Sequence, residues 1–425
     1  MIERRLTASV LEALATHPVV FLRGARQTGK TTLVAALAAQ GHPATYLTLD
    51  DPDTLAAAVA DPAGFVAAFP APLIVDEVQR APGLALAIKR AVDQDRSAGR
   101  FLLTGSAQVL VLPSLSRELV GRMGILTLWP FSQSELDERR ERFIDWLFRE
   151  QMAAPPVAEP CDRQDLLRRA CTGGFPEAVA ADSARTRDAW SAAYLDTVLQ
   201  RDIGSLAQIE GLVALPRLLS LLAARAGGLL NVAELSRTAA MPRSTLDRYL
   251  ALLSGVFLLQ LLPAWSSNLG KRLVKSPKAY LTDTGLQAYL LGLTPERLAA
   301  EPRHAGPLLE AFAFAEVAKL CTWSAARPSL YHYRSHAGRG VDLVLEDRAG
   351  RVVGLEVKAA ETVSEADTAG LRALAELAGE RFHRGVVLYA GRRSLPFGPR
   401  LHVMPLSALW RLDDAQGAGA AAAAG

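Results

Sequence analysis

The sequence predicts an α/β protein in three parts, in which an N-terminal α/β domain, a helical middle region and a second α/β domain follow one another. Between residues 19 and 129, five short apolar runs alternate with helical patterns, which is typical of a parallel sheet. Helical patterns dominate from residue 165 to residue 254. Farther on, three strand-like runs between residues 330 and 358 follow another helical pattern. At 425 residues, the chain is long enough for each part to have its own core.

The first apolar run, 19–22, leads into a loop bounded by glycines and then into a helical pattern. The loop reads Gly24-x-x-x-x-Gly29-Lys30-Thr31, the pattern of a Walker A phosphate loop in its usual strand–loop–helix context. Glycines let backbone N–H groups surround a phosphate, and the lysine can reach the β- and γ-phosphates of ATP. The predicted nucleotide-binding residues of this loop are Gly24, Ala25, Arg26, Gln27, Thr28, Gly29, Lys30, Thr31 and Thr32.

A second motif follows the buried run 73–75, which ends in Asp76 and Glu77. Open α/β sheets bind their ligands at the carboxyl ends of the strands, where these two acids are expected. We expect Asp76, together with the Thr31 hydroxyl, to hold Mg²⁺ beside the nucleotide. Glu77 is the candidate that orients the attacking water, so Glu77 and Lys30 are predicted to be catalytic. The predicted ligands are ATP and Mg²⁺.

Two further elements of this domain each have two possible interpretations. The run 101–103 ends near Thr104 and Ser106, which either sense the γ-phosphate or form a simple turn. Arg122 precedes the fifth run, 125–129. It is a candidate catalytic arginine that a neighbouring subunit supplies, which would require a homo-oligomer. A packing or salt-bridging arginine is the equally weighted alternative.

The middle region begins after a proline-rich stretch, 153–160, which is expected to end a first domain of residues 1–152. Residues 161–300 read as helical, and helices at 215–226, 232–239 and 244–254, followed by a hairpin-like run at 256–265, predict a winged helix at about 212–265. Between Arg237 and Lys278, seven Lys and Arg residues accompany one acid, Asp247. This excess predicts a DNA-binding face, and protein packing is the alternative.

The last domain, 301–412, combines acidic and basic residues on adjacent predicted strands. Asp342 lies on the run 341–346, and Glu356 and Lys358 share one face of the run 352–358, with a turn at 347–350 between the two. Glu310 lies on the preceding helix, 308–320. These carboxylates predict a metal site of Glu310, Asp342 and Glu356, in which Lys358 would steady a developing phosphate charge. Alternatively, the charges keep an edge strand soluble.

Composition restricts the remaining function classes. The three cysteines form no CxxC pair, there is no apolar leader, and the most apolar run, 250–262, is too short to cross a bilayer. These features predict a cytoplasmic protein without a membrane partner. The alanine- and glycine-rich tail, 413–425, is expected to be disordered.

Taken together, these motifs resemble those of a bacterial and archaeal family of predicted ATPases with an AAA-like domain and a C-terminal DUF4143 region. The matching strings are GARQTGKTTL, LIVDEVQRAP, LLTGSA, LVGRMGILTLWPFSQSE, GGFPEAV, KRLVKSPKAYLTDTGLQAYLLG, GPLLEAF, VDLVLE and GLEVKAA. The resemblance implies an AAA-like P-loop NTPase core, a winged helix and a C-terminal fold similar to PD-(D/E)xK restriction endonucleases.

The resemblance also assigns roles to individual residues. Lys30, Thr31, Asp76 and Glu77 match the ATPase positions, and the nuclease-like positions correspond to Glu310, Asp342, Glu356 and Lys358. From the motifs and this resemblance together, we predict an ATPase that couples its nucleotide state to DNA binding by the winged helix and the nuclease-like domain. The alternative is a nucleotide-gated regulatory or scaffold protein whose nuclease fold is catalytically inactive.

Overall fold

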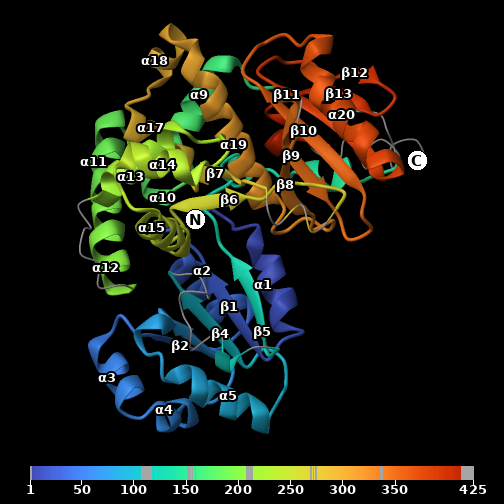
Figure 1. Ribbon diagram of the computed structural model, residues 1–425. Helices are drawn as coiled ribbons and strands as arrows, with labels where there is room; N and C mark the ends of the chain where they lie inside the picture. The colour runs from blue at the N-terminus through green and yellow to red at the C-terminus, as the bar shows by residue number, and fades with distance from the viewer. Residues whose placement is uncertain are drawn as a thin grey trace.

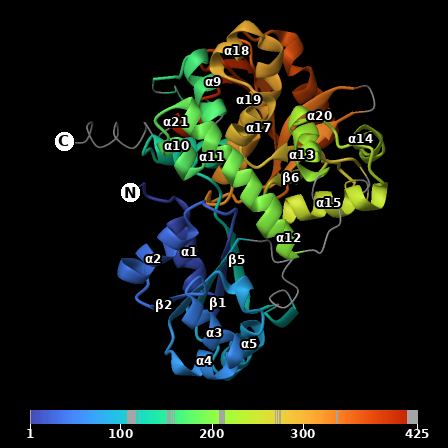
Figure 2. The same ribbon diagram turned by 90° about the vertical axis from the view of Figure 1, so that its left-hand side faces the viewer.

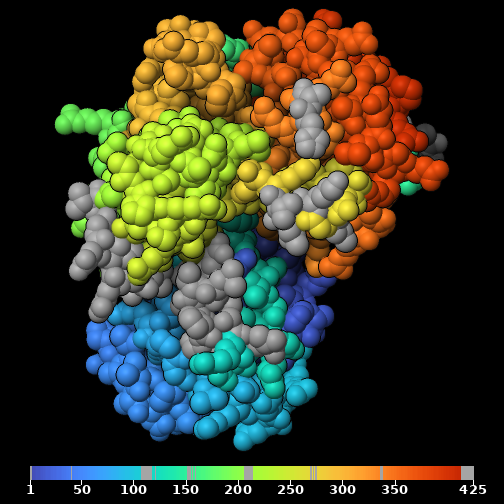
Figure 3. All heavy atoms as spheres, in the orientation of Figure 1, coloured from blue at the N-terminus to red at the C-terminus, as the bar shows by residue number. Residues whose placement is uncertain are grey.

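A computed structural model describes residues 2–106, 117–119, 121–150, 155, 157, 159–206, 214–268, 270, 272, 275–335 and 338–412. The N-terminal domain forms one lobe (blue in Figure 3), and the middle region and C-terminal domain lie side by side above it. Within the described part of the chain, no helix is long and apolar enough to cross a membrane. The predicted disordered tail and half of the proline-rich stretch lie outside the described residues.

The N-terminal domain is built on a parallel sheet with strand order β2-β3-β4-β1-β5 (Figure 1). All four strand pairings are parallel, which confirms the predicted α/β sheet. The five strands match the five apolar runs: β1 (Val19–Arg23), β2 (Thr45–Thr48), β3 (Leu73–Asp76), β4 (Phe101–Gly105) and β5 (Met123–Thr127).

Alternating side chains of these strands build two cores. One face packs against α1 (Leu6–Leu14) and α2 (Lys30–Ala36) through Val20 and Leu22. The other face packs through Val19 and Phe21 against the helices α3 (Pro52–Ala60), α4 (Pro62–Ala68) and α5 (Leu84–Gln94). A sheet covered on both faces leaves its strand ends as the place where polar side chains can gather.

The middle region is mainly helical. Its first helices are α9 (Arg163–Thr172), α10 (Pro176–Ala180) and α11 (Ala184–Thr197), and α11 continues through a π-helical turn, Val198–Asp202, into α12 (Ile203–Leu206). The three helices predicted next are confirmed as α13 (Leu215–Ala224), α14 (Val232–Ala239) and α15 (Arg243–Gly255).

The predicted hairpin-like run differs from the observed pairing. Strand β6 (Leu259–Leu262) pairs antiparallel with β7 (Lys278–Leu281), beyond the predicted run, and Leu229 adds one bridge to Lys278. Apolar patterning locates a strand but does not name its partner, which explains the difference. The helices α17 (Thr284–Leu291) and α18 (Pro295–Ala300) complete the region.

The C-terminal domain contains a six-stranded mixed sheet with strand order β12-β13-β11-β10-β9-β8. Helix α19 (Ala305–Leu320) packs on one face and α20 (Ala369–Ala378) on the other. The strands are β8 (Ser329–Arg334), β9 (Gly340–Glu346), β10 (Val352–Lys358), β11 (Phe382–Tyr389), β12 (Leu395–Gly398) and β13 (Leu401–Pro405), and a short helix, α21 (Ala408–Arg411), follows. Antiparallel pairing of β9 with β10 confirms the hairpin predicted at 347–350.

The segment after the first sheet belongs by packing to the upper lobe. Helix α7 (Gln133–Leu136) begins with a capping box between Ser132 and Glu135, as predicted. Helix α8 (Phe143–Leu147) then packs in one core with α9, α19 and the C-terminal sheet. The packing boundary of the first domain therefore precedes α8, ahead of the residue 152 inferred from the proline-rich stretch.

Candidate functional site

The phosphate loop joins β1 to α2 at the carboxyl edge of the parallel sheet. Gly29 has a φ of 89°, in the left-handed region that favours glycine. A Cβ atom on Gly24 would lie 2.2 Å from the backbone oxygen of Leu128, so only glycine fits there. The two glycines that define the motif are thus required by the backbone path of this loop.

Lys30 is folded back along this loop. Its Nζ donates to the backbone oxygens of Gly24 at 3.1 Å and Ala25 at 2.9 Å, and the residue is buried. Burial lowers the pKa of the ammonium group, while the Glu77 and Asp76 carboxylates act in the opposite direction. A phosphate in the loop would give Nζ an anionic partner in place of neutral carbonyl oxygens.

The Asp76 carboxylate, at the end of β3, contacts the loop directly. Thr31 Oγ1 donates to Asp76 Oδ2 at 2.8 Å, Tyr46 OH donates to the same oxygen at 3.0 Å, and Thr104 Oγ1 donates to Oδ1. Burial and this carboxylate raise the pKa of Tyr46 to about 12. A hydroxyl and a carboxylate oxygen side by side fit Mg²⁺, which prefers oxygen ligands and keeps several waters.

Glu77, the next residue, has a φ of 58°, in the left-handed region, so the extended backbone of β3 ends before it. Its backbone N–H donates to Thr104 Oγ1 at 3.0 Å. Its carboxylate accepts from Gln79 Nε2 and, at 3.4 Å, from Ser106 Oγ. The polar ends of β3 and β4 therefore meet at one place. Sequence reasoning missed Gln79, although it stands two residues after the acid pair.

Arg122 lies away from this cluster. Met123, the residue after it, pairs with Val19 at the start of β1, whereas the phosphate loop follows Arg23 at the end of β1. The intervening strand spans about 16 Å. Arg122 instead forms an ion pair with Asp93, with Nη2 at 2.7 Å from Oδ1. Within one chain, the structure does not bring Arg122 to the phosphate loop.

An apolar pocket of about 490 Å³ opens beside the loop. It includes Gly29, Thr32 and one face of α2, and its far wall is formed by α1, Phe131 and Pro176. Pro176 belongs to the GGFPEAV string of the middle region. No pattern within the first domain signals this pocket, because its walls come from segments distant in the chain.

The middle region covers the outer side of the phosphate loop. In Figure 2, α11 and α12 run from the upper lobe down toward the first sheet. Arg26 pairs with Asp202 at 3.4 Å, and Trp190 Nε1 donates to Gln27 Oε1 at 3.2 Å. Ala25 is buried in the core of the middle region. Movement of this loop would therefore be transmitted directly to α11 and α12.

Three carboxylates of the C-terminal domain lie close together, as the sequence predicts: Glu310 of α19, Asp342 of β9 and Glu356 of β10. We call this cluster the acidic hairpin. An additional lysine lies among its carboxylates. Lys278 Nζ lies 2.8 Å from Glu310 Oε1 and 3.0 Å from Asp342 Oδ1. Burial and the nearby Asp342 raise the pKa of Glu356 to about 7. The fourth predicted residue, Lys358, pairs with Glu356 at 3.0 Å.

This arrangement does not fit a divalent ion. Across the described ranges, no group of three or more His, Cys, Asp and Glu residues is arranged to hold a metal. A magnesium ion would need oxygen ligands at about 2.1 Å, in the space where the Lys278 ammonium lies.

The predicted basic face of the middle region is partly used within the chain. Arg272 makes two hydrogen bonds to Glu346, at 2.6 and 3.2 Å, and Lys278 is paired as described. Lys271 lies outside the described residues. The arginines at 237, 243 and 248, on and beside α14 and α15, are exposed. Any phosphate contact by this face would therefore be expected from these arginines.

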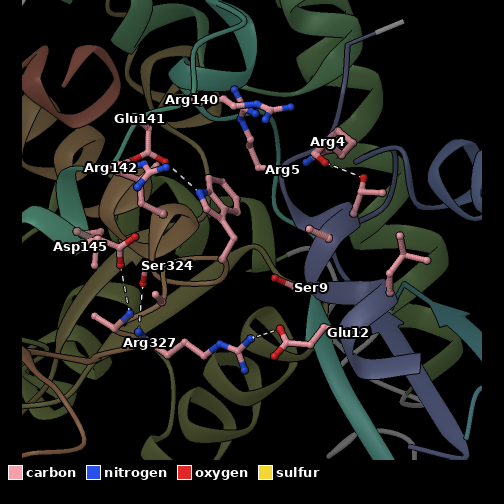
Figure 4. Close-up of a pocket in the computed structure, with 18 of the residues that line it drawn as sticks. Arg4, Arg5, Ser9, Glu12, Arg140, Glu141, Arg142, Asp145, Ser324 and Arg327 are labelled. Atoms are coloured by element: carbon pink, nitrogen blue, oxygen red, sulfur yellow. Dashed lines mark hydrogen bonds and ion pairs between the residues drawn. The ribbon is translucent and has the colours of Figure 1, made fainter. Parts of the chain in front are cut away.

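A second cavity, of about 910 Å³, lies between α1, residues 140–145 and the loop after α19 (Figure 4). Arg327 pairs with Glu12 at 2.6 Å, and Trp323 Nε1 donates to Glu141 Oε1 at 3.0 Å. Burial raises the pKa of Glu141 to about 7. None of the predicted site residues lines this cavity, but Arg4, which does, donates from Nη1 to the Thr28 backbone oxygen of the phosphate loop at 2.7 Å.

Each of the three parts of the chain matches a known domain family. Residues 16–137 match the model of an AAA domain, residues 163–297 match a domain of unknown function (DUF8612), and residues 305–409 match another (DUF4143). A match to an AAA domain implies nucleotide binding. The solved structure of a Walker-type ATPase of Pyrococcus abyssi is 16% identical, with a TM-score of 0.39, over 68% of this chain and 96% of that chain.

Two full-length relatives are uncharacterised proteins of Mycobacterium tuberculosis and Mycobacterium bovis. Each is 31% identical over 407 residues, which cover 95% of this chain and 84% of the relative. With its AAA P-loop domain, DUF8612 region and DUF4143 domain, the chain therefore belongs to the family of these mycobacterial proteins.

Proposed function

We propose that the protein is an ATPase that binds ATP and Mg²⁺ at the phosphate loop. The observation that carries this proposal is the contact between the Thr31 hydroxyl and the buried Asp76 carboxylate, 2.8 Å apart and beside Lys30. These are the three groups that phosphate-loop ATPases use around the β- and γ-phosphates. Phosphate release from ATP by the purified full-length protein tests the proposal, and no release above a Lys30→Ala control would contradict it.

Each group has a distinct task in this proposal. Lys30 would exchange its two carbonyl partners for phosphate oxygens, and Thr31 and Asp76 would hold Mg²⁺. When bound, Mg²⁺ neutralises part of the charge on the β- and γ-phosphates. Glu77, which Gln79 and Ser106 hold at the same edge of the sheet, would orient the attacking water.

The apolar pocket beside the loop is proposed as the base site. Ala36 lines this pocket and its neighbour Ala35 does not, although both residues are exposed on α2. Tryptophan at position 36 would fill the pocket, so Ala36→Trp is expected to weaken ATP binding at least about tenfold, or about 1.4 kcal/mol. Titration with a fluorescent ATP analogue measures the effect. Ala35→Trp is the matched control, and equal losses in both variants would place the base elsewhere.

DNA binding is proposed for the middle region. The order α13, bridge residue Leu229, α14, α15, β6 and β7 supports a winged helix, because that fold has the same succession of helices and paired strands. Replacing Arg237, Arg243 and Arg248 with glutamine should weaken binding to duplexes of any sequence. The slope of log affinity against log salt should become shallower by about 0.9 for each phosphate that the protein no longer neutralises.

Fluorescence anisotropy at several salt concentrations checks this prediction. A control with the same loss of charge carries glutamine at Arg96, Arg185 and Arg303, which are exposed elsewhere on the molecule. If both triple variants change the slope equally, general electrostatics and not the winged helix accounts for binding. If neither changes it, the basic face serves another purpose, such as protein packing.

For the C-terminal domain, we favour the regulatory alternative, a nuclease-like fold that does not cleave. The ion pairs of Lys278 with Glu310 and Asp342 support this choice, because they use the carboxylates that a metal-dependent nuclease would need. The role of Arg122 as a catalytic arginine supplied by a neighbouring subunit stays a prediction. Its ion pair with Asp93 would have to open first.

A further inference from the structure

The middle region is joined to the edge of the C-terminal sheet. Ala264 forms a parallel bridge with His332 of β8. The Trp265 N–H donates to the His332 backbone oxygen at 2.6 Å, and the His332 N–H donates to the Pro263 oxygen at 2.9 Å. In Figure 1, β6 and β7 accordingly approach β8 beside the C-terminal domain. The chain that follows β6 is therefore joined to the edge strand β8 by one bridge and two backbone hydrogen bonds.

Two cations from the same segment reach into the C-terminal domain. Arg272 binds Glu346 with both Nη atoms and lies over the Tyr331 ring, 4.9 Å from its centre. Lys278, on β7, is 9% exposed and binds Glu310 and Asp342. The side chains of both cations are no more than 20% exposed, and so are those of the carboxylates that they bind, Glu346, Glu310 and Asp342. The ion pairs are thus buried parts of the junction between the two regions.

Further hydrogen bonds hold the two carboxylates that Lys278 binds. Glu310 Oε1 also accepts from Tyr280 OH at 2.8 Å, and Asp342 Oδ2 accepts from the Val357 N–H at 3.0 Å. Two carboxylates that approach one position in a buried site repel each other, and a cation between them relieves this repulsion. The Lys278 ammonium supplies that charge, and Lys358 supplies a second cation to Glu356.

We propose that Lys278 is a tethered cation that takes the place of a divalent metal in the acidic hairpin and locks the middle region onto the C-terminal domain. Mg²⁺ or Mn²⁺ cannot bind Glu310 and Asp342 while Nζ lies at 2.8 and 3.0 Å from their oxygens. The acidic hairpin is therefore an intramolecular docking site for a lysine. This inference is independent of the proposed ATPase, because it concerns the nucleotide-free protein.

The test is a gain of metal binding. Lys278→Met keeps the length of the side chain and removes its charge, so Glu310 and Asp342 become available to a metal. In calorimetric titrations of the nucleotide-free full chain with Mn²⁺, this variant is expected to gain one site at least tenfold tighter than any binding by the wild type. The double variant Lys278→Met/Asp342→Asn should lose it. Lys275→Met, three residues earlier on the same segment, is the matched control and should resemble the wild type.

Two results would overturn the proposal. One is stoichiometric Mn²⁺ uptake by the wild type that disappears in Asp342→Asn, because the lysine would then not exclude the metal. The other is a folded Lys278→Met variant that gains no site. If Lys278→Met does not fold, Lys278→Met/Glu310→Gln/Asp342→Asn removes the repulsion and should restore folding. Failure of that neutral variant to fold would also contradict the proposal.

Discussion

Lys30→Ala is expected to weaken ATP binding at least about a hundredfold. Lys30 Nζ donates hydrogen bonds to two backbone oxygens of the loop, at 3.1 and 2.9 Å. With ATP bound, Nζ would instead donate charge-assisted hydrogen bonds to phosphate oxygens. Each such hydrogen bond contributes about 1.5–3 kcal/mol, so the loss of two costs at least about 3 kcal/mol of binding free energy. A hundredfold loss of affinity corresponds to about 2.8 kcal/mol. Titration of a fluorescent ATP analogue against both proteins measures the loss.

The matched control removes a lysine of the same domain outside the loop. Lys89, on α5, pairs with Glu118 at 3.1 Å, and Lys89→Ala should bind ATP like the wild type. Burial lowers the pKa of the Lys30 ammonium group, which means that the folded protein disfavours this buried charge. Lys30→Ala removes the charge, so thermal unfolding without nucleotide should show that the variant remains folded. Equal ATP affinity of Lys30→Ala and wild type would rule out this loop as the nucleotide site.

Glu77→Gln is expected to keep ATP binding and to lower the rate of hydrolysis about 10²- to 10⁴-fold, the range for loss of a general base. The amide retains the size of the carboxylate and an oxygen that Gln79 and Ser106 can still contact, but it cannot accept a proton from the attacking water. Nucleotide titration together with steady-state phosphate release separates the two effects.

Asp50→Asn is the control for this second prediction. Asp50 lies at the same edge of the sheet, after β2, and its carboxylate pairs with Arg80 at 2.6 Å on the surface. Its loss should leave turnover within about fivefold of the wild type, because exposed ion pairs contribute about 0–1 kcal/mol. Unchanged turnover in Glu77→Gln would mean that another group orients the water, and lost binding would mean that Glu77 shapes the nucleotide site itself.

Much of the nucleotide site could be predicted because its parts are local. The glycines, Lys30 and Thr31 lie in one loop, and Asp76 ends a strand whose apolar run is visible in the sequence. Parallel strands place their carboxyl ends at one edge, which brings Asp76 to Thr31 although 45 residues separate them. The partners Tyr46, Gln79 and Thr104 were less predictable, because polar residues at strand ends are common.

The contacts between the regions could not be predicted in this way. Asp202 reaches Arg26 across 176 residues, and Pro176 closes the pocket beside the phosphate loop. Periodicity shows which face of an element is buried, but it does not show against which other region that face packs. The pocket beside the phosphate loop and the contacts that cover this loop therefore depend on where the middle region packs.

The acidic hairpin shows most clearly which features follow from the sequence and which follow only from the tertiary structure. By itself, the sequence determined the class of each region, the β9–β10 hairpin and the clustering of Asp342 with Glu356, because alternation along neighbouring strands decides which side chains share a face. Only the tertiary structure decided what these carboxylates bind. Lys278 lies 32 residues from Glu310 and 64 from Asp342, and it reaches them because the segment around Ala264, directly after β6, docks on β8. A cation stabilises buried carboxylates, and the docking of the two regions determines that the cation is this lysine.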